Sequence, residues 1–318
     1  PFTDHRSPAT CYLQLATCNS MNPFLHKLGY TSTDRVVVLH ADDIGMCHAT
    51  LLALDGLLDA GLISSAATMV PCPWFNGAAE ICRQRAGDPR LDMGVHVTLT
   101  SEWTAYRWRP LSTAAPSSGL LDAEGYFPTR AMPVYQGGDL DAVRAEVVAQ
   151  VERALAAGID ITHIDSHMLT MFHPRLAQVY VDVAQQFALP PLLVRIPASW
   201  LIDMGYSADE VDAAERLIET AEAAGLPVFD YLSVLPLDHH EDRMGEIQRV
   251  LAELPAGLSI ILMHPAADTP ELRAIAPDWR CRVADYQLFT DPALRRLLDD
   301  AGVHVLGFRA LRDALRGT

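Results

Sequence analysis

Carboxylates and imidazoles stand at the ends of several apolar segments of this chain. The apolar run over residues 36–41 leads directly into Asp42 and Asp43. Buried parallel strands read as continuous aliphatic runs, and α/β folds build their active sites at the carboxyl ends of such strands. Where the backbone turns at a strand end, both carboxylates can reach one pocket, one binding a cation and the other acting as a base. An Asp pair can also cap a helix, so this segment alone leaves both interpretations open.

Two more strand-like segments carry polar residues toward their ends. One holds His96, and the next holds His163, Asp165 and His167 at alternating positions, which places these three on one face of a strand. A single histidine in an apolar strand is more often a core residue than a ligand. One carboxylate with two imidazoles, however, is the ligand set of an open catalytic metal site, and it suits zinc or another first-row metal.

A fourth strand-like segment, residues 258–264, ends at His264, just before a proline. Imidazole titrates near neutral pH, so a histidine that binds no metal can act as a general acid. A structural histidine at a strand end is the alternative. A base, a metal ion that activates water and an acid would together hydrolyse a bond.

The order of these motifs resembles the YdjC-like carbohydrate deacetylases, which include the chitooligosaccharide deacetylases. The matching motifs are ADDIG (41–45), GVHVTL (94–99), THIDSH (162–167) and MHPA (263–266), and residues 282–286 also fit the family pattern. The resemblance runs from about Val36 to the C-terminus. It implies removal of an acetyl group from an N-acetylated sugar or chitooligosaccharide-like substrate.

The resemblance also implies a role for each motif residue. Asp43, His96 and His167 are expected to hold a divalent metal ion, zinc or magnesium. Asp42 is the expected base and His264 the expected acid. A metal ion in this position would polarise the acetyl carbonyl and lower the pKa of water.

Three further residues are candidates for supporting the site or binding the substrate. Asp165 can orient His264 or a metal-bound imidazole, because ligating histidines usually donate their second N–H to a carboxylate or a carbonyl. Arg195 can pair with Asp42, bind an acidic substrate group, or form a structural salt bridge. His163 shares the strand face of Asp165.

The chain departs from the family pattern directly after His167. Further histidines often follow in the family, whereas here residues 168–172 contain none and the next histidine is His173. The metal ligands are unaffected by this change. A more apolar surface beside the metal predicts a different or more hydrophobic acetylated substrate.

Strand and helix patterns alternate along the chain, with glycine after several helices, as in a parallel barrel or a doubly wound sheet. Candidate strands lie near residues 35–40, 62–70, 91–98, 161–167, 192–196, 228–234, 258–264 and 303–308. Candidate helices lie at 141–157, 208–224, 242–253 and 292–301. The family resemblance implies an irregular (β/α) TIM-like barrel, and we adopt this α/β fold class.

The length of 318 residues, half of them hydrophobic, fits one barrel domain over residues 21–318. Residues 1–20 have mixed composition and are expected to be a disordered or vector-derived tail. An insertion near residues 100–139 follows the His96 strand and emerges on the active-site face. Its aromatic residues either stack on sugar rings, or cover the barrel mouth or pack at a subunit contact.

The formal net charge of −16 argues against nucleic acid and anionic membrane surfaces as partners. The six cysteines form no Cys-x-x-Cys pair, and no apolar run is long enough to span a membrane, so a cytoplasmic location is expected. A homodimer is expected from the family resemblance and from the frequency of symmetric dimers.

Two other functions are compatible with these residues. The same barrel and metal could hydrolyse another amide or an O-acetyl ester. A noncatalytic sugar-binding barrel is the alternative from a different class, and the complete set of base, metal ligands and acid argues against it.

Overall fold

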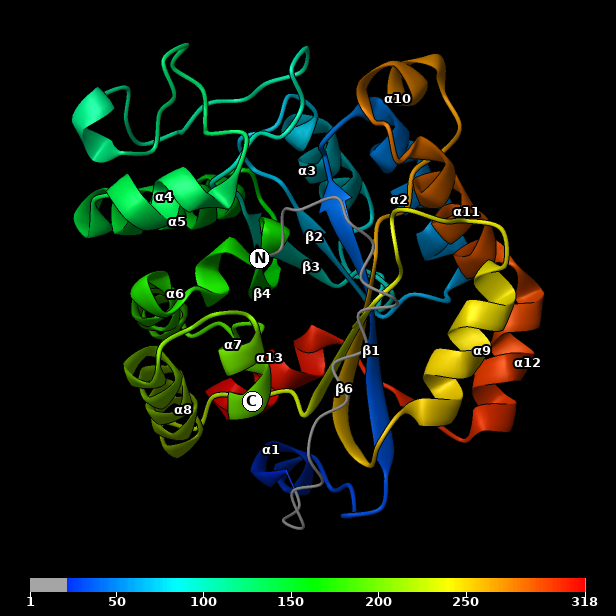
Figure 1. Cartoon of the computed structure of the whole chain (residues 1–318). Coiled ribbons are helices and arrows are strands. Elements are labelled where there is room, and N and C mark those ends of the chain that lie inside the picture. Colours follow the sequence, from blue (N-terminus) through cyan, green and yellow to red (C-terminus); the bar gives the residue numbers. More distant parts are fainter. Residues whose placement is uncertain (1–21, 318) are drawn as a thin grey trace.

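Parallel strands form the centre of the molecule and helices cover their outer side (Figure 1). The computed structural model describes residues 22–317, so the tail predicted at residues 1–20 lies outside the described residues. The strands are β1 (Arg35–Ile44), β2 (Ser65–Thr68), β3 (Met93–Val97), β4 (Ile161–Ser166), β5 (Tyr231–Val234), β6 (Gly257–Met263) and β7 (His304–Val305).

The strands pair in the order β4-β3-β2-β1-β6-β5, and every pairing is parallel. Two isolated bridges close this sheet into a ring. Ile164 of β4 pairs with Pro191, and Val194 pairs with Phe229, just before β5. The predicted strand near residues 192–196 is therefore reduced to single bridges, while β7 pairs only with the first half of β1. The fold is an irregular (β/α) barrel, which confirms the expected fold class.

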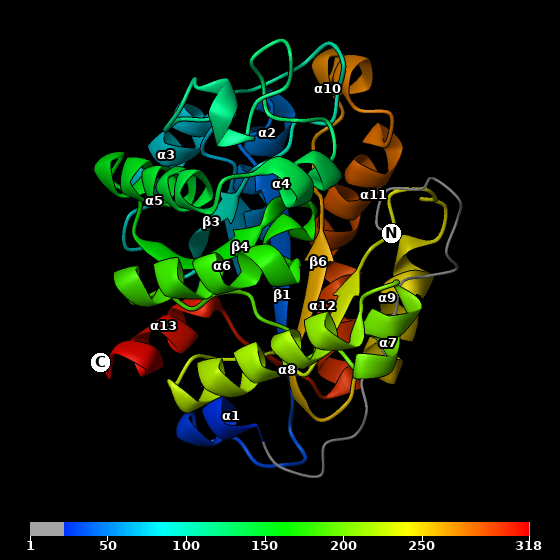
Figure 2. The ribbon, with the colours of Figure 1, turned by 60° about the vertical axis from the view of Figure 1, so that its left-hand side comes forward.

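The four helices predicted from periodicity are present, with bounds that differ by at most one residue. The α-helices are α1 (Pro23–Lys27), α2 (His48–Ala60), α3 (Phe75–Gln84), α4 (Ala131–Gly137), α5 (Leu140–Ala156), α6 (Pro174–Phe187), α7 (Ala198–Asp203), α8 (Ala208–Ala223), α9 (Arg243–Glu253), α10 (Pro270–Ile275), α11 (Trp279–Thr290), α12 (Pro292–Ala301) and α13 (Phe308–Arg316). Two 3-10 helices, η1 (Pro116–Ser118) and η2 (His167–Phe172), lie in loops. Helices α5, α6 and α8 cover one side of the barrel, and α9, α11 and α12 cover another (Figure 2).

Alternate residues of β1 and β6 belong to the apolar interior of the barrel. These are Val36, Val38, Leu258, Ile260 and Leu262, which pack together in one buried cluster. Because side chains alternate along a strand, the next residues on the same face are polar and stand at the carboxyl ends. The barrel is therefore apolar toward the amino ends of the strands and polar toward the carboxyl ends.

Phe308, the first residue of α13, belongs to the same apolar interior. Its ring stacks on His163, with ring centroids 3.8 Å apart, and it also contacts His40 edge-on at 5.8 Å. The two histidines thus form the boundary between the apolar part of the barrel and the polar mouth. This boundary fixes the depth at which the polar side chains begin.

The segment over residues 98–130 is irregular except for η1. It crosses the carboxyl ends of the strands (Figure 1). Trp108 and Phe127 are buried in the main core, and the Trp108 Nε1 donates a hydrogen bond to the Thr100 carbonyl. Arg107 donates hydrogen bonds to Asp122 and to the Phe127 carbonyl. These contacts pack the two buried aromatic residues against the barrel and hold the segment over its mouth.

Among residues 22–317, no helix is both long and apolar enough to cross a lipid bilayer.

The four cysteines in this part of the chain, Cys47, Cys72, Cys82 and Cys281, are buried and free. Burial raises the pKa of all four thiols. These four cysteines therefore form no disulfide with one another.

A substitution at Gly94 of β3 tests how tightly the barrel interior is packed. A methyl group at Gly94 would lie 2.4 Å from the His163 ring, which is packed against Phe308, so Gly94→Ala must displace the ring. We expect this substitution to lower the free energy of unfolding by about 1–3 kcal/mol, measured by urea denaturation. Gly137→Ala is the control, because no atom outside its own helix and chain neighbours lies within 4 Å of its added methyl group. Equal stabilities of the two variants would contradict this packing.

Candidate metal centre and active site

The backbone turns at Asp43, the second carboxylate of the aspartate pair. Asp43 has a φ of 64°, and the pairing of β1 with β2 shifts register between Ala41 and Ile44. In a regular strand Asp42 and Asp43 would face opposite sides of the barrel wall. The left-handed turn instead leaves both carboxylates buried near the mouth, as expected for a strand end that serves one pocket.

Asp43, His96 and His167 meet at the carboxyl ends of β1, β3 and β4. Asp43 Oδ1 lies 3.3 Å from His96 Nε2 and 3.1 Å from His167 Nδ1. The candidate donor atoms of the three residues all lie within 4.8 Å of one another, and all three side chains are buried. The structure therefore brings together the three residues that the sequence nominated as metal ligands.

Each of these two imidazoles contacts a second carboxylate through its far nitrogen. His96 Nδ1 lies 2.8 Å from Asp165 Oδ2, and His167 Nε2 lies 2.9 Å from Glu102 Oε2. In a neutral imidazole whose far nitrogen donates its proton to a carboxylate, the near nitrogen is left with a lone pair. Metal-binding histidines typically have this arrangement, so the donor set fits a divalent cation.

Two other groups of buried residues have donor atoms at a similar spacing, and both include Asp165. One is His40 with His163, and the other is Asp42 with His96. Asp165 Oδ2 already contacts the ring of His40 in the first group and the ring of His96 in the second. The group around Asp43 is better suited to a cation, because both of its imidazoles have a separate carboxylate partner on the far side.

A buried arginine fixes the second oxygen of Asp43. Arg282 Nη1 of α11 donates to Asp43 Oδ2 at 2.7 Å, and Arg282 also pairs with Asp278. Burial raises the pKa of Asp43, but the charges of Arg282 and His167 outweigh burial and hold the pKa well below its usual value. Asp43 is therefore an anion, with Oδ1 directed at the two histidines.

Asp42 lies between two histidines. Its Oδ1 is 3.1 Å from His40 Nε2, and its Oδ2 is 3.7 Å from His264 Nε2. His40 Nε2 also lies 2.9 Å from Asp165 Oδ2. Burial lowers the pKa of His40, but its hydrogen bonds and charge contacts with Asp165 and Asp42 raise it to about 9. A protonated His40 can thus hold Asp42 from inside the barrel.

His264 is fixed through its backbone by α11. The His264 N–H donates to Asp285 Oδ2 at 3.0 Å, and Asp285 Oδ1 lies 2.8 Å from Arg243 Nε of α9. Burial raises the pKa of Asp285 to about 7 and lowers the pKa of His264. Helix α11 therefore supports both sides of the site, with Arg282 on Asp43 and Asp285 on His264.

Of the three alternatives for Arg195, the structure shows the structural salt bridge, in which the guanidinium donates to Glu222 of α8, and no pairing with Asp42 is formed. Asp165 supports the imidazole of His96, one of the two alternatives for it.

His163 shares the inward face of Asp165 but lies deeper in the barrel. Its ring is fully buried, stacks on Phe308 and contacts the Thr162 hydroxyl at 2.9 Å. Burial lowers the pKa of His163 well below its usual value. His163 packs against His40 from below, so its position fits the first of its two expected roles, supporting the site, rather than contact with the substrate.

The sequence reasoning missed three residues of the site. His40 has a visible signal, because it stands two residues before Asp42 and therefore on the same face of β1. Arg282 belongs to a segment that fits the family pattern, but nothing in the spacing shows that it reaches Asp43. Glu102 lies in an irregular segment, where no periodicity indicates the direction of a side chain.

Comparison with known proteins assigns the chain to a family. The sequence profile of the YdjC-like protein family matches residues 36–300. The chain belongs to the YdjC-like family. A carbohydrate deacetylase of Thermus thermophilus is 36% identical over 281 residues, which cover 88% of this chain and 95% of the relative. A carbohydrate deacetylase of Thermoanaerobacter pseudethanolicus is 23% identical and covers 87% of this chain and 100% of its own length.

A solved structure has the same fold as this YdjC-like protein. It belongs to an Enterococcus faecalis protein whose proposed activity is cellobiose-phosphate cleavage. The match has a TM-score of 0.71 at 21% identity and covers 87% of this chain and 99% of the other. At this level of identity the likeness concerns the barrel fold alone.

Glu102 tests how the site holds a cation. We expect Glu102→Gln to weaken the affinity for zinc about 10- to 100-fold, because the amide no longer fixes His167 as the carboxylate does. Isothermal titration of the metal-stripped protein with zinc measures this change. Glu124→Gln, an exposed position on the same segment, is the matched control and should bind zinc as the unmodified protein does. Unchanged affinity in Glu102→Gln would remove Glu102 from the site.

Proposed function

We propose that this YdjC-like protein is a metal-dependent hydrolase that removes an acetyl group from an N-acetylated sugar or chitooligosaccharide-like substrate. One observation carries the proposal. The Asp43, His96 and His167 donors lie at the same barrel mouth as the pair of Asp42 and His264. The carbohydrate deacetylases among the relatives support the reaction class.

The expected cofactor is a divalent ion, zinc or magnesium. Asp43, His96 and His167 would hold it, with Asp165 and Glu102 fixing the two imidazoles. When bound, such an ion polarises the acetyl carbonyl and activates water for attack.

The remaining steps belong to residues of the chain. Asp42 accepts a proton from the attacking water at Oδ2, while His40 holds its other oxygen. His264 Nε2, 3.7 Å from that oxygen, donates a proton to the departing sugar nitrogen as the C–N bond breaks. The products are acetate and the free amine. Because burial lowers the pKa of His264, its protonated form is a stronger acid than free imidazolium.

Hydrolysis of a different amide or of an O-acetyl ester would use the same groups. The substrate therefore has to be tested directly. Acetate release is measured from N-acetylglucosamine, its oligomers and an O-acetylated sugar of the same size. The proposal predicts release from an N-acetylated member of this series. Acetate release from the O-acetyl sugar alone would show that the protein hydrolyses esters rather than amides. Acetate release from none of these compounds would contradict the proposed substrate class.

A substitution of Asp42 distinguishes a role in catalysis from a role in metal binding. We expect Asp42→Asn to lower kcat about 10²- to 10⁴-fold, because an amide cannot accept the proton from water. Metal affinity should stay nearly unchanged, because Asp43 and the two histidines remain. Acetate release and zinc titration on one preparation measure both quantities. Asp59→Asn, an exposed position on α2, controls for the loss of a carboxylate and should keep full activity.

Unchanged turnover in Asp42→Asn would remove this residue from the mechanism. Loss of metal binding in the same variant would make Asp42 a ligand rather than a base.

A further inference from the structure

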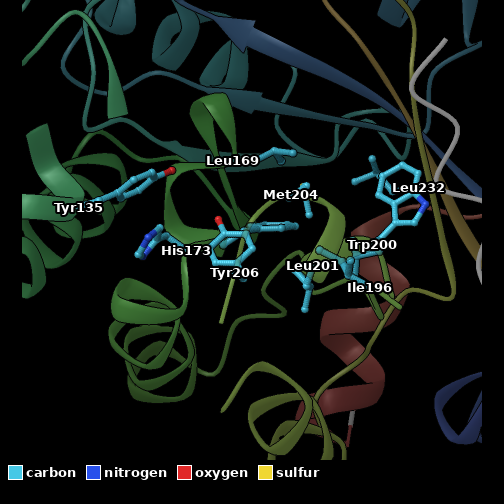
Figure 3. A pocket seen from close by; sticks show the side chains of 11 residues that line it. Tyr135, Leu169, His173, Ile196, Trp200, Leu201, Met204, Tyr206 and Leu232 are labelled. Atoms are coloured by element: carbon cyan, nitrogen blue, oxygen red, sulfur yellow. The ribbon is translucent and has the colours of Figure 1, made fainter. Parts of the chain in front are cut away.

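An apolar pocket lies beside the barrel mouth (Figure 3). Its walls come from η2, from the segment after residue 191, from α7 and the turn that follows it, and from single residues of α4 and β5. The lining residues are Tyr135, Leu169, Phe172, His173, Val194, Ile196, Trp200, Leu201, Met204, Tyr206 and Leu232.

The position of the pocket follows from the order of the strands around the ring. Val194 and Leu232 belong to the apolar interior of the barrel, and Ile196 packs against it. These residues occupy the sector between β4 and β6, because the segment after residue 191 and β5 lie between those two strands. β4 leads directly into His167, and β6 leads into His264. The pocket therefore lies in the sector of the barrel between the strand that leads to the metal ligand His167 and the strand that leads to the acid His264.

The backbone after His167 directs a side chain into this pocket. Met168 and Leu169 have φ values of 53° and 51°, a left-handed conformation that non-glycine residues seldom adopt. The Ser166 hydroxyl accepts the Met171 N–H at 2.9 Å and helps to hold the turn. As a result Leu169 lines the pocket, while Met168 is partly exposed to solvent. Strained backbone of this kind is concentrated at functional sites.

The chemistry of the lining selects against a strongly polar occupant. None of the lining residues is Asp, Glu, Lys or Arg. His173 stacks on Tyr135, with ring centroids 4.0 Å apart, and burial lowers its pKa, so it is neutral near pH 7. A second sugar would bury several hydroxyl groups with few partners, which is unfavourable. An aromatic or aliphatic group would gain from burial against these side chains.

We propose that this pocket binds an apolar aglycone of the acetylated sugar, of which an aryl group is the simplest example. The inference rests on the proposed function, because it places the acetyl group at the metal centre and the aglycone between His167 and His264. The pocket thereby sets the substrate preference of the site.

The test compares the phenyl and methyl β-glycosides of N-acetylglucosamine, which differ only in the group placed in the pocket. Affinity is measured by isothermal titration of the zinc-loaded full-length protein, and acetate release is measured in parallel. We expect the phenyl glycoside to bind at least tenfold more tightly than the methyl glycoside. Trp200→Ala and Leu169→Ala should each reduce this ratio severalfold.

Ile202→Ala is the matched control, because Ile202 lies on the same helix as Trp200, is 57% exposed and does not line the pocket. It should keep the full preference for the phenyl glycoside. Equal affinities for the two glycosides, no binding of either one, or a preference that survives both pocket substitutions would each overturn the inference.

The two measurements separate this inference from the proposed function. Binding of the phenyl glycoside that depends on Trp200, without acetate release, would support the pocket and contradict the deacetylase activity. Equal binding and equal acetate release from both glycosides would support the activity and overturn the pocket.

Discussion

The left-handed turn at Asp43 is the constraint on which the site depends. A regular strand would point one carboxylate of the pair into the barrel and the other into the layer of helices. The turn, with a φ of 64°, places both carboxylates at the mouth and gives each a separate set of partners. Asp43 faces His96, His167 and Arg282, whereas Asp42 faces His40 and His264. The proposed division into ligand and base therefore originates in the backbone.

Several buried or partly buried carboxylates can stand this close together because each has a positive or protic partner. Asp165 lies between the rings of His40 and His96, Glu102 accepts from His167, and Arg282 pairs with Asp43. A carboxylate buried without such partners would be very costly. A divalent cation would add to this compensation at the point where Asp43 and the two imidazoles meet. These contacts leave Asp43, His96 and His167 as a buried group of donors that could hold a metal ion.

The sequence predicted the parts of the structure that follow from a regular period. Strand β1 and the face shared by His163, Asp165 and His167 could be read from it, because strands alternate and buried runs are apolar. The depth of each residue could not be read in this way. His163 lies beside Phe308 because α13, far away in the chain, begins at the bottom of the barrel.

Contacts between distant and irregular segments were also beyond the sequence. Arg195 pairs with Glu222, whereas Arg282 reaches Asp43 from 239 residues away, and only the packed fold determines which arginine lies near the pair. Glu102 and the apolar pocket depend on loop conformations, including the left-handed turn after His167. Such conformations have no periodic signature in the sequence.

The most direct test of the account is the position of a bound metal ion. Crystals grown with zinc, with diffraction recorded at the zinc absorption edge, would locate the ion without reference to activity. The account predicts an anomalous peak at about 2.0–2.2 Å from Asp43 Oδ1, His96 Nε2 and His167 Nδ1. A peak between His40, His163 and Asp165, or no peak at the barrel mouth, would contradict it.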